Sequence, residues 1–383
     1  MGDSAKEEHH EIHTRVHFKA MKCRVQESLI YGLLAAAFLF CCTRPALGVI
    51  LHPDGEPNLA TWTDRPDSNV VGRWSSNASF VVVAPNWIIT TRHQNTFPTT
   101  VTIGGISYTC HYKDEWTGGS AVEPPGIADV QLVRLTTIDG ENPDLIHYAS
   151  PYIGTDEHID PNTGETGREI RIGGYGRGRE AKLKGGIPRR VYGYTWGTDA
   201  NNNNYTLRWC TNRAEDYEDS STLASYISDV LIGYFDVPGW TEYEGIPAEY
   251  DSGGGWFIYD SNEWKLISLT RAVTSHGDPW PENGESWFRY VLDTPRGGDY
   301  MDAVRISSYA AWIYDIIYVP GDLTGDDWVD FTDFGAFANQ WGRDDCSELN
   351  NWCEGADFEP TNGSVDWDDL AFLADVWLTG WEY

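Results

Sequence analysis

One stretch decides how the rest of this sequence is interpreted: Tyr250-Asp251-Ser252-Gly253-Gly254-Gly255. A serine hydroxyl is a poor nucleophile at neutral pH. It needs an imidazole base, a carboxylate that orients this base, and backbone N–H donors for the developing oxyanion. The glycines allow the backbone to turn sharply beside the hydroxyl. Because Asp, Ser and Gly are also the commonest turn residues, the stretch fits either a nucleophile loop or a plain surface turn. Only the remaining members of a triad can separate these two interpretations.

A candidate base follows a β-rich segment upstream. Residues Phe80–Ile89 predict two short strands joined by a Pro-Asn turn, and the second strand leads to His93. Catalytic groups often lie where a strand passes into a loop. The other histidines after residue 48 lack a comparable strand and turn before them: His52, His111, His147, His158 and His276. His93 is therefore the predicted base, with an ordinary surface histidine as the alternative.

A candidate orienting carboxylate stands at the head of an alternating apolar run. Asp129 precedes Val130–Leu135, which predicts a buried strand. A carboxylate that enters a buried strand is costly unless it gains a partner, and an imidazole N–H is such a partner. The nearby carboxylates Asp114, Asp139 and Asp144 remain alternatives. The chain order His, Asp, Ser differs from the orders found in subtilisin and in α/β-hydrolases.

With these residues, the segment from Val49 to about Val319 resembles the trypsin-like (chymotrypsin-fold) serine peptidases. The resemblance implies a mainly β fold with two β-barrels, in which His93, Asp129 and Ser252 are catalytic and no cofactor is needed. It also implies an oxyanion hole formed by the N–H groups of Tyr250 and Ser252. Tyr250 stands where the family usually has glycine, so the rival interpretation is a catalytically inactive trypsin-like domain that binds protein or polysaccharide.

The same resemblance implies where substrate binds. The strand Leu266–Thr270, with Ser268 and Thr270, corresponds to the segment that pairs with the substrate backbone. The floor of the primary pocket corresponds to Ile246, which predicts a preference for uncharged or apolar residues, with a preference for Glu as the contrary case. The expected substrate is a protein or peptide. Residues 306–317 resemble the terminal helix of the family, and Gly173–Gly178 predicts a turn between strands.

The amino-terminal segment has the pattern of a secretion signal. The apolar run Ser28–Cys42 is short for a membrane span and is followed by Ala46-Leu47-Gly48, a small-x-small cleavage pattern. We expect a signal peptide over residues 1–48, with Met21 as a second candidate start, and secretion to the exterior or the cell surface without a remaining membrane span. A lipidated Cys41 or Cys42, or an uncleaved anchor, is the alternative.

Cleavage after Gly48 would expose Val49-Ile50 as a new amino end. In trypsin-like enzymes such an apolar end folds inward, and its ammonium pairs with the aspartate before the nucleophile, here Asp251. Signal cleavage would then also activate the enzyme. The two residues that follow, Leu51-His52, replace the glycines that are usual in the family.

Charge excludes one class of partner. The chain has 27 Lys and Arg residues against 58 Asp and Glu residues, a net charge of −31. Such a surface repels phosphates, so we expect no nucleic-acid binding. Residues 320–383 hold 16 of the acidic residues and one basic residue, Arg343. This tail therefore differs in kind from the segment before it, and Tyr318-Val319-Pro320-Gly321 marks a short boundary.

The tail contains a duplicated loop-and-helix pattern. Val329, Asp330, Asp333 and Trp341 recur 36 residues later as Val365, Asp366, Asp369 and Trp377. Residues 322–333 carry oxygen ligands at the spacing by which one short loop wraps calcium. A charge-rich solvated tail is the alternative, although aspartates at this density require a cation to offset their repulsion. Cys346 and Cys353 could form a small disulfide outside the cell, while the pairing of Cys110 and Cys210 stays open.

The tail resembles a type I dockerin, a small α-helical calcium-binding domain that attaches secreted enzymes to cohesin-bearing proteins. The resemblance implies Ca2+ as the bound ion and a cohesin-bearing protein as the partner. In the first loop the implied ligands are Asp322, Thr324, Asp326, Trp328 through its carbonyl, Asp330 and Asp333. In the second loop, with one extra residue near Asn362-Gly363, they are Asp357, Glu359, Thr361, Asp366 and Asp369.

Overall fold

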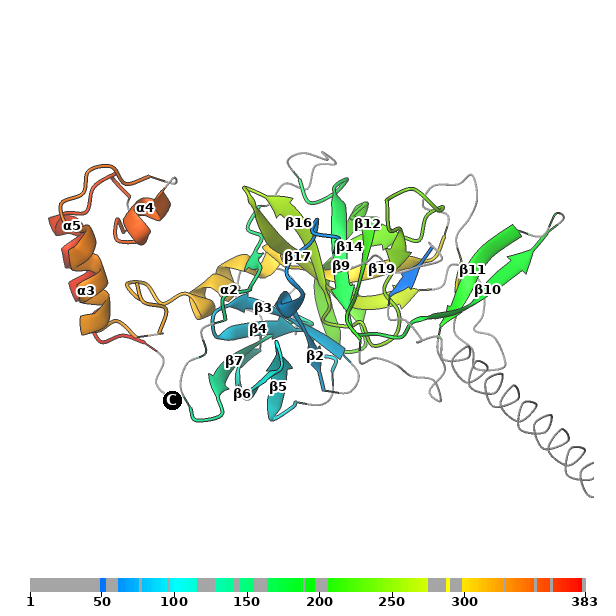
Figure 1. Ribbon diagram of the computed structural model, residues 1–383, viewed down its shortest axis with the longest axis horizontal. Coiled ribbons are helices and arrows are strands. Elements are labelled where there is room, and N and C mark those ends of the chain that lie inside the picture. Colours follow the sequence, from blue (N-terminus) through cyan, green and yellow to red (C-terminus); the bar gives the residue numbers. More distant parts are fainter. Residues whose placement is uncertain are drawn as a thin grey trace, which may run out of the picture. The chain divides into compact units, whose positions relative to one another are not determined.

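The computed structural model describes most of the chain after residue 48 (Figure 1). The described residues are 49–52, 61–75, 78–94, 97–115, 128–140, 143, 145–154, 164–186, 188, 190–196, 206–274, 287–289, 298–326, 328–347, 350–358 and 361–380. The expected signal peptide over residues 1–48, with Met21, Cys41 and Cys42, lies outside them. Within the described ranges no helix is long and apolar enough to cross a membrane.

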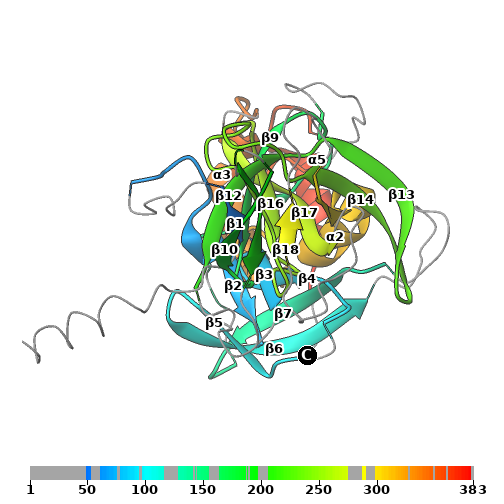
Figure 2. The ribbon, with the colours of Figure 1, turned by 90° about the vertical axis from the view of Figure 1, so that its right-hand side faces the viewer.

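Six antiparallel strands form the first sheet. A short 3-10 helix, η1 (Ser68–Val70), leads into it. In spatial order the strands are β2 (Val71–Trp74), β3 (Ala78–Ala84), β4 (Trp87–Thr90), β7 (Gln131–Thr137), β6 (Ile106–Glu115) and β5 (Thr100–Ile103). The sheet is strongly curved (Figure 2). The two strands predicted within Phe80–Ile89 and the strand after Asp129 are confirmed as β3, β4 and β7.

Strand β3 explains why this part of the sequence is continuously apolar rather than alternating. All seven of its residues are buried. Phe80 and Val82 face the interior of the first sheet, where they pack with Val101 and Leu135. Val81 and Val83 face the opposite way, into a core shared with the second sheet. A strand with a hydrophobic core on both faces has no solvent-facing positions to fill with polar residues.

The second sheet curls into a nearly closed barrel. Its strands, in spatial order, are β12 (Arg208–Arg213), β9 (Glu169–Gly174), β16 (Gly255–Asp260), β17 (Glu263–Thr274), β19 (Tyr300–Arg305), β14 (Tyr226–Tyr234) and β13 (Asp216–Leu223), with β8 (Ser150–Pro151) parallel to β17. Residues of β16 alternate between two cores: Trp256 and Ile258 fill the interior of this sheet, and Phe257 packs into the core shared with the first sheet. The shared core holds the two sheets together.

Two small sheets and two short helices complete this part. β1 (Ile50–Leu51) pairs with β15 (Gly245–Ile246), and β10 (Arg179–Gly185), β11 (Arg190–Trp196) and β18 (Trp287–Arg289) form a three-stranded sheet. The turn predicted at Gly173–Gly178 lies between β9 and β10, as expected. The predicted terminal helix is observed as the 3-10 helix η3 (Ser307–Tyr309) and α2 (Ala310–Ile317).

The C-terminal segment is helical, and its two repeats have the same local structure. Helices α3 (Phe331–Gln340) and α5 (Trp367–Asp375) each begin with a capping box, formed by Asp330 with Asp333 and by Asp366 with Asp369. A short turn, α4 (Asn351–Glu354), lies between them, and Cys346 and Cys353 form the expected disulfide. The chain is therefore mainly β with a small C-terminal helical region, which confirms the coarse fold prediction.

Candidate active site and metal site

His93 and Asp129 meet because their strands are neighbours in the first sheet. β4 and β7 are antiparallel, with Thr90 opposite Gln131, so the loop after β4 and the residues before β7 lie at the same end. His93 Nδ1 lies 2.6 Å from Asp129 Oδ2, and the His93 backbone N–H donates to Asp129 Oδ1 at 2.8 Å. Asp129 is fully buried. The imidazole thus supplies the partner that a buried carboxylate requires.

Ser252 reaches this pair from the loop between β15 and β16. Its Oγ lies 2.9 Å from His93 Nε2, and its carbonyl accepts the backbone N–H of Ser79 in β3 at 2.8 Å. Gly253 has a φ of +79°, and a Cβ there would lie 2.2 Å from the Ser79 carbonyl oxygen. Only glycine fits this close approach, so Gly253 is required by the contact between the two sheets.

Hydrogen bonding at His93 gives the imidazole a defined tautomer. With Asp129 as acceptor, Nδ1 carries the proton, and the Nε2 lone pair faces the Ser252 hydroxyl. This is the arrangement in which an imidazole can withdraw a proton from serine. The amide of Gln94 lies 3.0 Å from the same Nε2, so a Gln94 N–H competes with the hydroxyl for that lone pair.

The sequence did not predict the contact between Asp129 and Ser228. Ser228 Oγ, in β14, accepts the backbone N–H of Asp129 at 2.9 Å. The Tyr309 hydroxyl at the start of the terminal helix bonds to Ser228, and burial raises the pKa of Tyr309 to about 12. Ser228 lies 99 residues from Asp129, and no local pattern announces such a pair.

Tyr250, predicted as an oxyanion donor, has a φ of +76°. Glycine adopts this region without penalty, whereas a residue with a Cβ is strained there. In the described part of the chain, neither the Tyr250 N–H nor the Ser252 N–H donates to another group of the protein. Both donors therefore remain available to an external acceptor.

Asp251, next to Ser252 in the same loop, is buried and held by backbone donors. Its carboxylate accepts the N–H of Gly176 at 2.6 Å and of Ala248 at 2.8 Å, and it also accepts the N–H of Val49. Burial raises the pKa of Asp251 to about 6, and these hydrogen bonds offset part of the rise. Val49 itself is buried. The residue expected to become the amino end after cleavage therefore contacts the carboxylate that it was expected to reach.

The predicted substrate-binding residues lie in the interior. Ser268 and Thr270 are buried in β17, whose two edges pair with β16 and β19 there. No backbone edge is left between Leu266 and Thr270 for a peptide. The part of β17 nearest the nucleophile is Arg271, whose carbonyl oxygen lies 3.5 Å from Ser252 Oγ. Arg271 lies at a register shift between Thr270 and Ala272, and β17 pairs with β19 on both sides of this shift.

Ile246 also lies in the core rather than at a surface. It is fully buried, and it pairs with Ile50 in the small sheet formed by β1 and β15. The two cysteines whose pairing was left open, Cys110 and Cys210, are both buried and both free thiols. They belong to the interiors of different sheets, which explains why they do not pair.

The first acidic loop of the tail brings three carboxylates together. Ligand oxygens of Asp322, Asp326 and Asp333 all lie within 4.8 Å of one another. The Thr324 hydroxyl donates to Asp333 Oδ1 at 3.0 Å, and the Asp330 N–H donates to Asp333 Oδ2 at 2.9 Å. A set made only of oxygen atoms, mostly charged, suits a hard divalent cation such as Ca2+.

The second loop has a related but less compact arrangement. Asp357 accepts the N–H groups of Asn362 and Gly363, and Asp369 accepts those of Phe358 and Asp366. Burial raises the pKa of Asp369, and the charges of Asp357 and Asp366 raise it further. The predicted ligand Glu359 lies outside the described residues, and Thr361 is half-buried. Among the described residues, only the first loop has three carboxylates that meet this closely.

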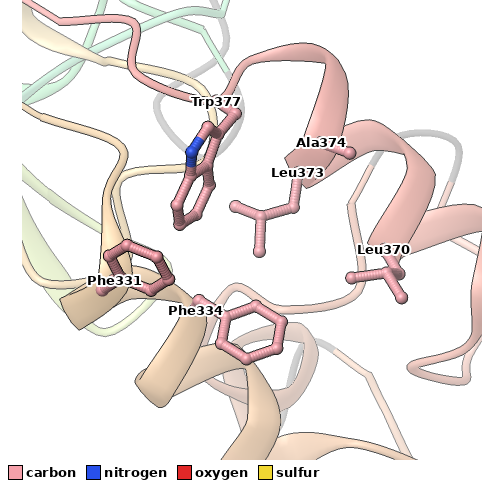
Figure 3. Close-up of a pocket in the computed structure, with 6 residues that line it drawn as sticks. All are labelled: Phe331, Phe334, Leu370, Leu373, Ala374 and Trp377. Atoms are coloured by element: carbon pink, nitrogen blue, oxygen red, sulfur yellow. The ribbon is translucent and has the colours of Figure 1, made fainter.

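The helices of the tail present an apolar face that follows the internal duplication. A cavity of about 440 Å3 is lined by Phe331, Phe334, Leu370, Leu373, Ala374 and Trp377 (Figure 3). The Phe331 and Trp377 rings meet edge to face at 5.1 Å, and their counterparts 36 residues away, Trp367 and Trp341, meet the same way at 5.2 Å. Phe331 is 79% exposed and Trp367 is 73% exposed. Large apolar exposure of this kind marks interaction surfaces.

Comparison with known proteins adds no identification. No protein-family model matches the chain, and no curated protein matches it. The functional argument therefore depends on the geometry of these two sites.

Proposed function

We propose that this protein is a secreted, trypsin-like serine endopeptidase with a double β-barrel that hydrolyses protein or peptide substrates through His93, Asp129 and Ser252. The observation that carries the proposal is one continuous chain of contacts, 2.6 Å from Asp129 to His93 and 2.9 Å from His93 to Ser252. Three separate segments supply these groups, because Asp129 lies 36 residues after His93 and Ser252 lies 159 residues after it. A plain surface turn at Ser252 would not require this convergence.

The proposed reaction is acyl transfer. The Ser252 hydroxyl attacks the scissile carbonyl carbon while its proton passes to His93 Nε2, and Asp129 stabilises the imidazolium that forms. The N–H groups of Tyr250 and Ser252 stabilise the oxyanion of the tetrahedral intermediate. His93 then gives the proton to the leaving amine, and the C–N bond breaks. Water, deprotonated by His93, hydrolyses the acyl-enzyme and regenerates Ser252.

The rival function is an inactive domain of the same fold that binds a protein or polysaccharide. Tyr250 in place of glycine favours it, because an aromatic side chain strains the oxyanion loop. Labelling with a fluorophosphonate distinguishes the two, since the reagent modifies only an activated serine. We expect one equivalent of label per protein and none in Ser252→Ala. An unlabelled, folded wild-type protein would support the binding domain.

For the tail we propose a calcium-dependent dockerin that attaches the peptidase to a cohesin-bearing protein. Asp322, Asp326 and Asp333 would hold the ion in the first loop, and Asp357, Asp366 and Asp369 would contribute in the second. Bound calcium would neutralise the crowded carboxylates and stabilise both helix starts. The duplicated aromatic face of α3 and α5 is the surface that we expect the partner to cover. Isothermal titration of the protein with calcium, with and without chelator pretreatment, tests the ion.

A further inference from the structure

Arg177 contacts the nucleophile loop in four ways, all of them at Glu249 and Tyr250. Its backbone N–H donates to the Glu249 carbonyl at 2.8 Å, and its Nη2 donates to the Tyr250 hydroxyl at 3.1 Å. Its guanidinium carbon lies 4.7 Å from the centroid of the Tyr250 ring, and its Nε lies 3.1 Å from Glu249 Oε2. Arg177 itself is 6% exposed, so its guanidinium is largely shielded from water.

Two of these contacts fall on Tyr250, whose backbone conformation is strained. Tyr250 has a φ of +76°, and the left-handed region costs a residue with a Cβ roughly 1–2 kcal/mol. Without a restraint, Tyr250 would spend most of its time at negative φ. Rotation about its N–Cα bond changes the direction of its N–H relative to Ser252, so the strained angle bears directly on the oxyanion hole.

We propose that Arg177 is a positioning residue that holds Tyr250 at positive φ. A glycine at position 250 would adopt this angle without help, and Arg177 makes the same angle stable for a tyrosine. The inference rests on the proposed peptidase function. Arg177 does not touch the reacting atoms, and it acts through the Tyr250 backbone. The planar guanidinium suits this task, because it stacks on the ring and reaches the hydroxyl at the same time.

The contacts of Arg177 with Glu249 and those with Tyr250 differ in strength. The Glu249 side chain is 47% exposed, and a half-exposed ion pair contributes little. The Tyr250 ring and hydroxyl are therefore the contacts that should matter. Accordingly, Glu249→Gln should leave the rate nearly unchanged, whereas Arg177→Ala should lower it.

A double-mutant cycle tests the proposal, with Arg177→Ala, Tyr250→Gly and the combined variant assayed on a chromogenic peptide and with a fluorophosphonate. We expect Arg177→Ala to lower kcat about tenfold with KM nearly constant, because the lost donor acts on the transition state. In the Tyr250→Gly background the same substitution should have no effect, since glycine adopts positive φ without help. Arg171→Ala, which removes a guanidinium from the Trp264 ring elsewhere, is the matched control and should change neither constant.

Equal losses from Arg177→Ala in the wild-type and Tyr250→Gly backgrounds would overturn the proposal, because they would make Arg177 a general structural support. An unchanged Arg177→Ala rate would overturn it too. If Arg177→Ala does not fold, Arg177→Lys keeps the charge without the planar stack, and the same cycle applies to it. If the wild-type protein cleaves no peptide and takes no fluorophosphonate label, the proposed function fails, and the inference about Arg177 is then tested by a crystal structure of Arg177→Ala. Tyr250 still at positive φ would overturn the inference. Tyr250 at negative φ would support it.

Discussion

Adding a single residue before Val49 should change how the folding stability depends on pH. In the structure Asp251 accepts the peptide N–H of Val49, and burial raises the pKa of Asp251 from its ordinary value of 3.8 to about 6. A chain that begins at Val49 would offer an ammonium at the same position. A chain that begins at Gly48 would offer only the neutral peptide group.

The sign and size follow from linkage. A carboxyl whose pKa is raised in the folded state contributes stability that is fully present below about pH 4 and is lost as the pH rises through about 6. A rise from 3.8 to about 6 corresponds to roughly 3 kcal/mol, at about 1.36 kcal/mol per pH unit. The protein that begins at Gly48 should lose this amount between about pH 4 and pH 7.5. The ammonium of Val49 favours the charged carboxylate, lowers the pKa of Asp251, and should remove most of the loss.

Urea denaturation of the two proteins at pH 4.5, 6 and 7.5, with calcium present, measures the effect. Their difference in unfolding free energy should grow from a small value at pH 4.5 to about 3 kcal/mol at pH 7.5. Other titrating groups, such as Glu244 with its pKa raised by burial to about 8, are common to both proteins and cancel. Asp251→Asn cannot ionise, so introducing it into both proteins should abolish the growth of the difference between pH 4.5 and pH 6. Parallel pH curves for the two proteins would refute the reasoning.

Three further predictions concern the loop and the tail. Gly253→Ala places a methyl group 2.2 Å from the Ser79 carbonyl oxygen, so we expect the unfolding free energy to fall by about 3 kcal/mol or more in chemical denaturation. A fall below about 1 kcal/mol would contradict the packing described. Asp333→Ala should weaken calcium binding measured by calorimetry more than Asp369→Ala does, because the first loop is the more compact; the opposite order would reject that ranking. Removal of residues 320–383 should leave the fluorophosphonate reaction at Ser252 within about twofold, because the two hydrophobic cores are separate, and a complete loss would show that the tail supports the site.

The parts of the molecule that sequence could predict are those with local patterns. β3 and β4 were predictable because a strand between two cores is continuously apolar and a Pro-Asn turn interrupts it. The repeat of the tail was predictable because duplication leaves matched residues 36 positions apart. His93 and Ser252 could be singled out because each lies in a loop beside a predicted strand, within a residue pattern typical of serine peptidases.

The remainder depends on contacts between residues far apart in the chain. Nothing near Arg177 indicates that it stacks on a tyrosine 73 residues away, and nothing near Ser228 indicates that it supports Asp129. The position of Ile246 depends on its pairing with Ile50. Ile50 belongs to the short segment that follows the expected cleavage point after Gly48. The Arg271 carbonyl beside Ser252 lies at a register shift in β17, and strand registers of this kind are set by tertiary packing.

The loop that carries Ser252 contacts segments from several parts of the chain, among them β17, where the Gly253 N–H donates to the Thr270 carbonyl at 2.8 Å. Ser79 of the first sheet binds the Ser252 carbonyl, Gly176 and Arg177 hold Asp251 and Tyr250, and Val49 donates to Asp251. Together these contacts fix the Ser252 carbonyl, the Asp251 carboxylate and the Tyr250 side chain. Since an oxyanion hole depends on the directions of two nearby N–H groups, loss of any one support should affect the reaction rate more than the binding of substrate. The Val49 contact is the one that cleavage after Gly48 would change from a neutral hydrogen bond to an ion pair. In the proposed peptidase, processing after Gly48 would therefore act on the Ser252 loop through this contact.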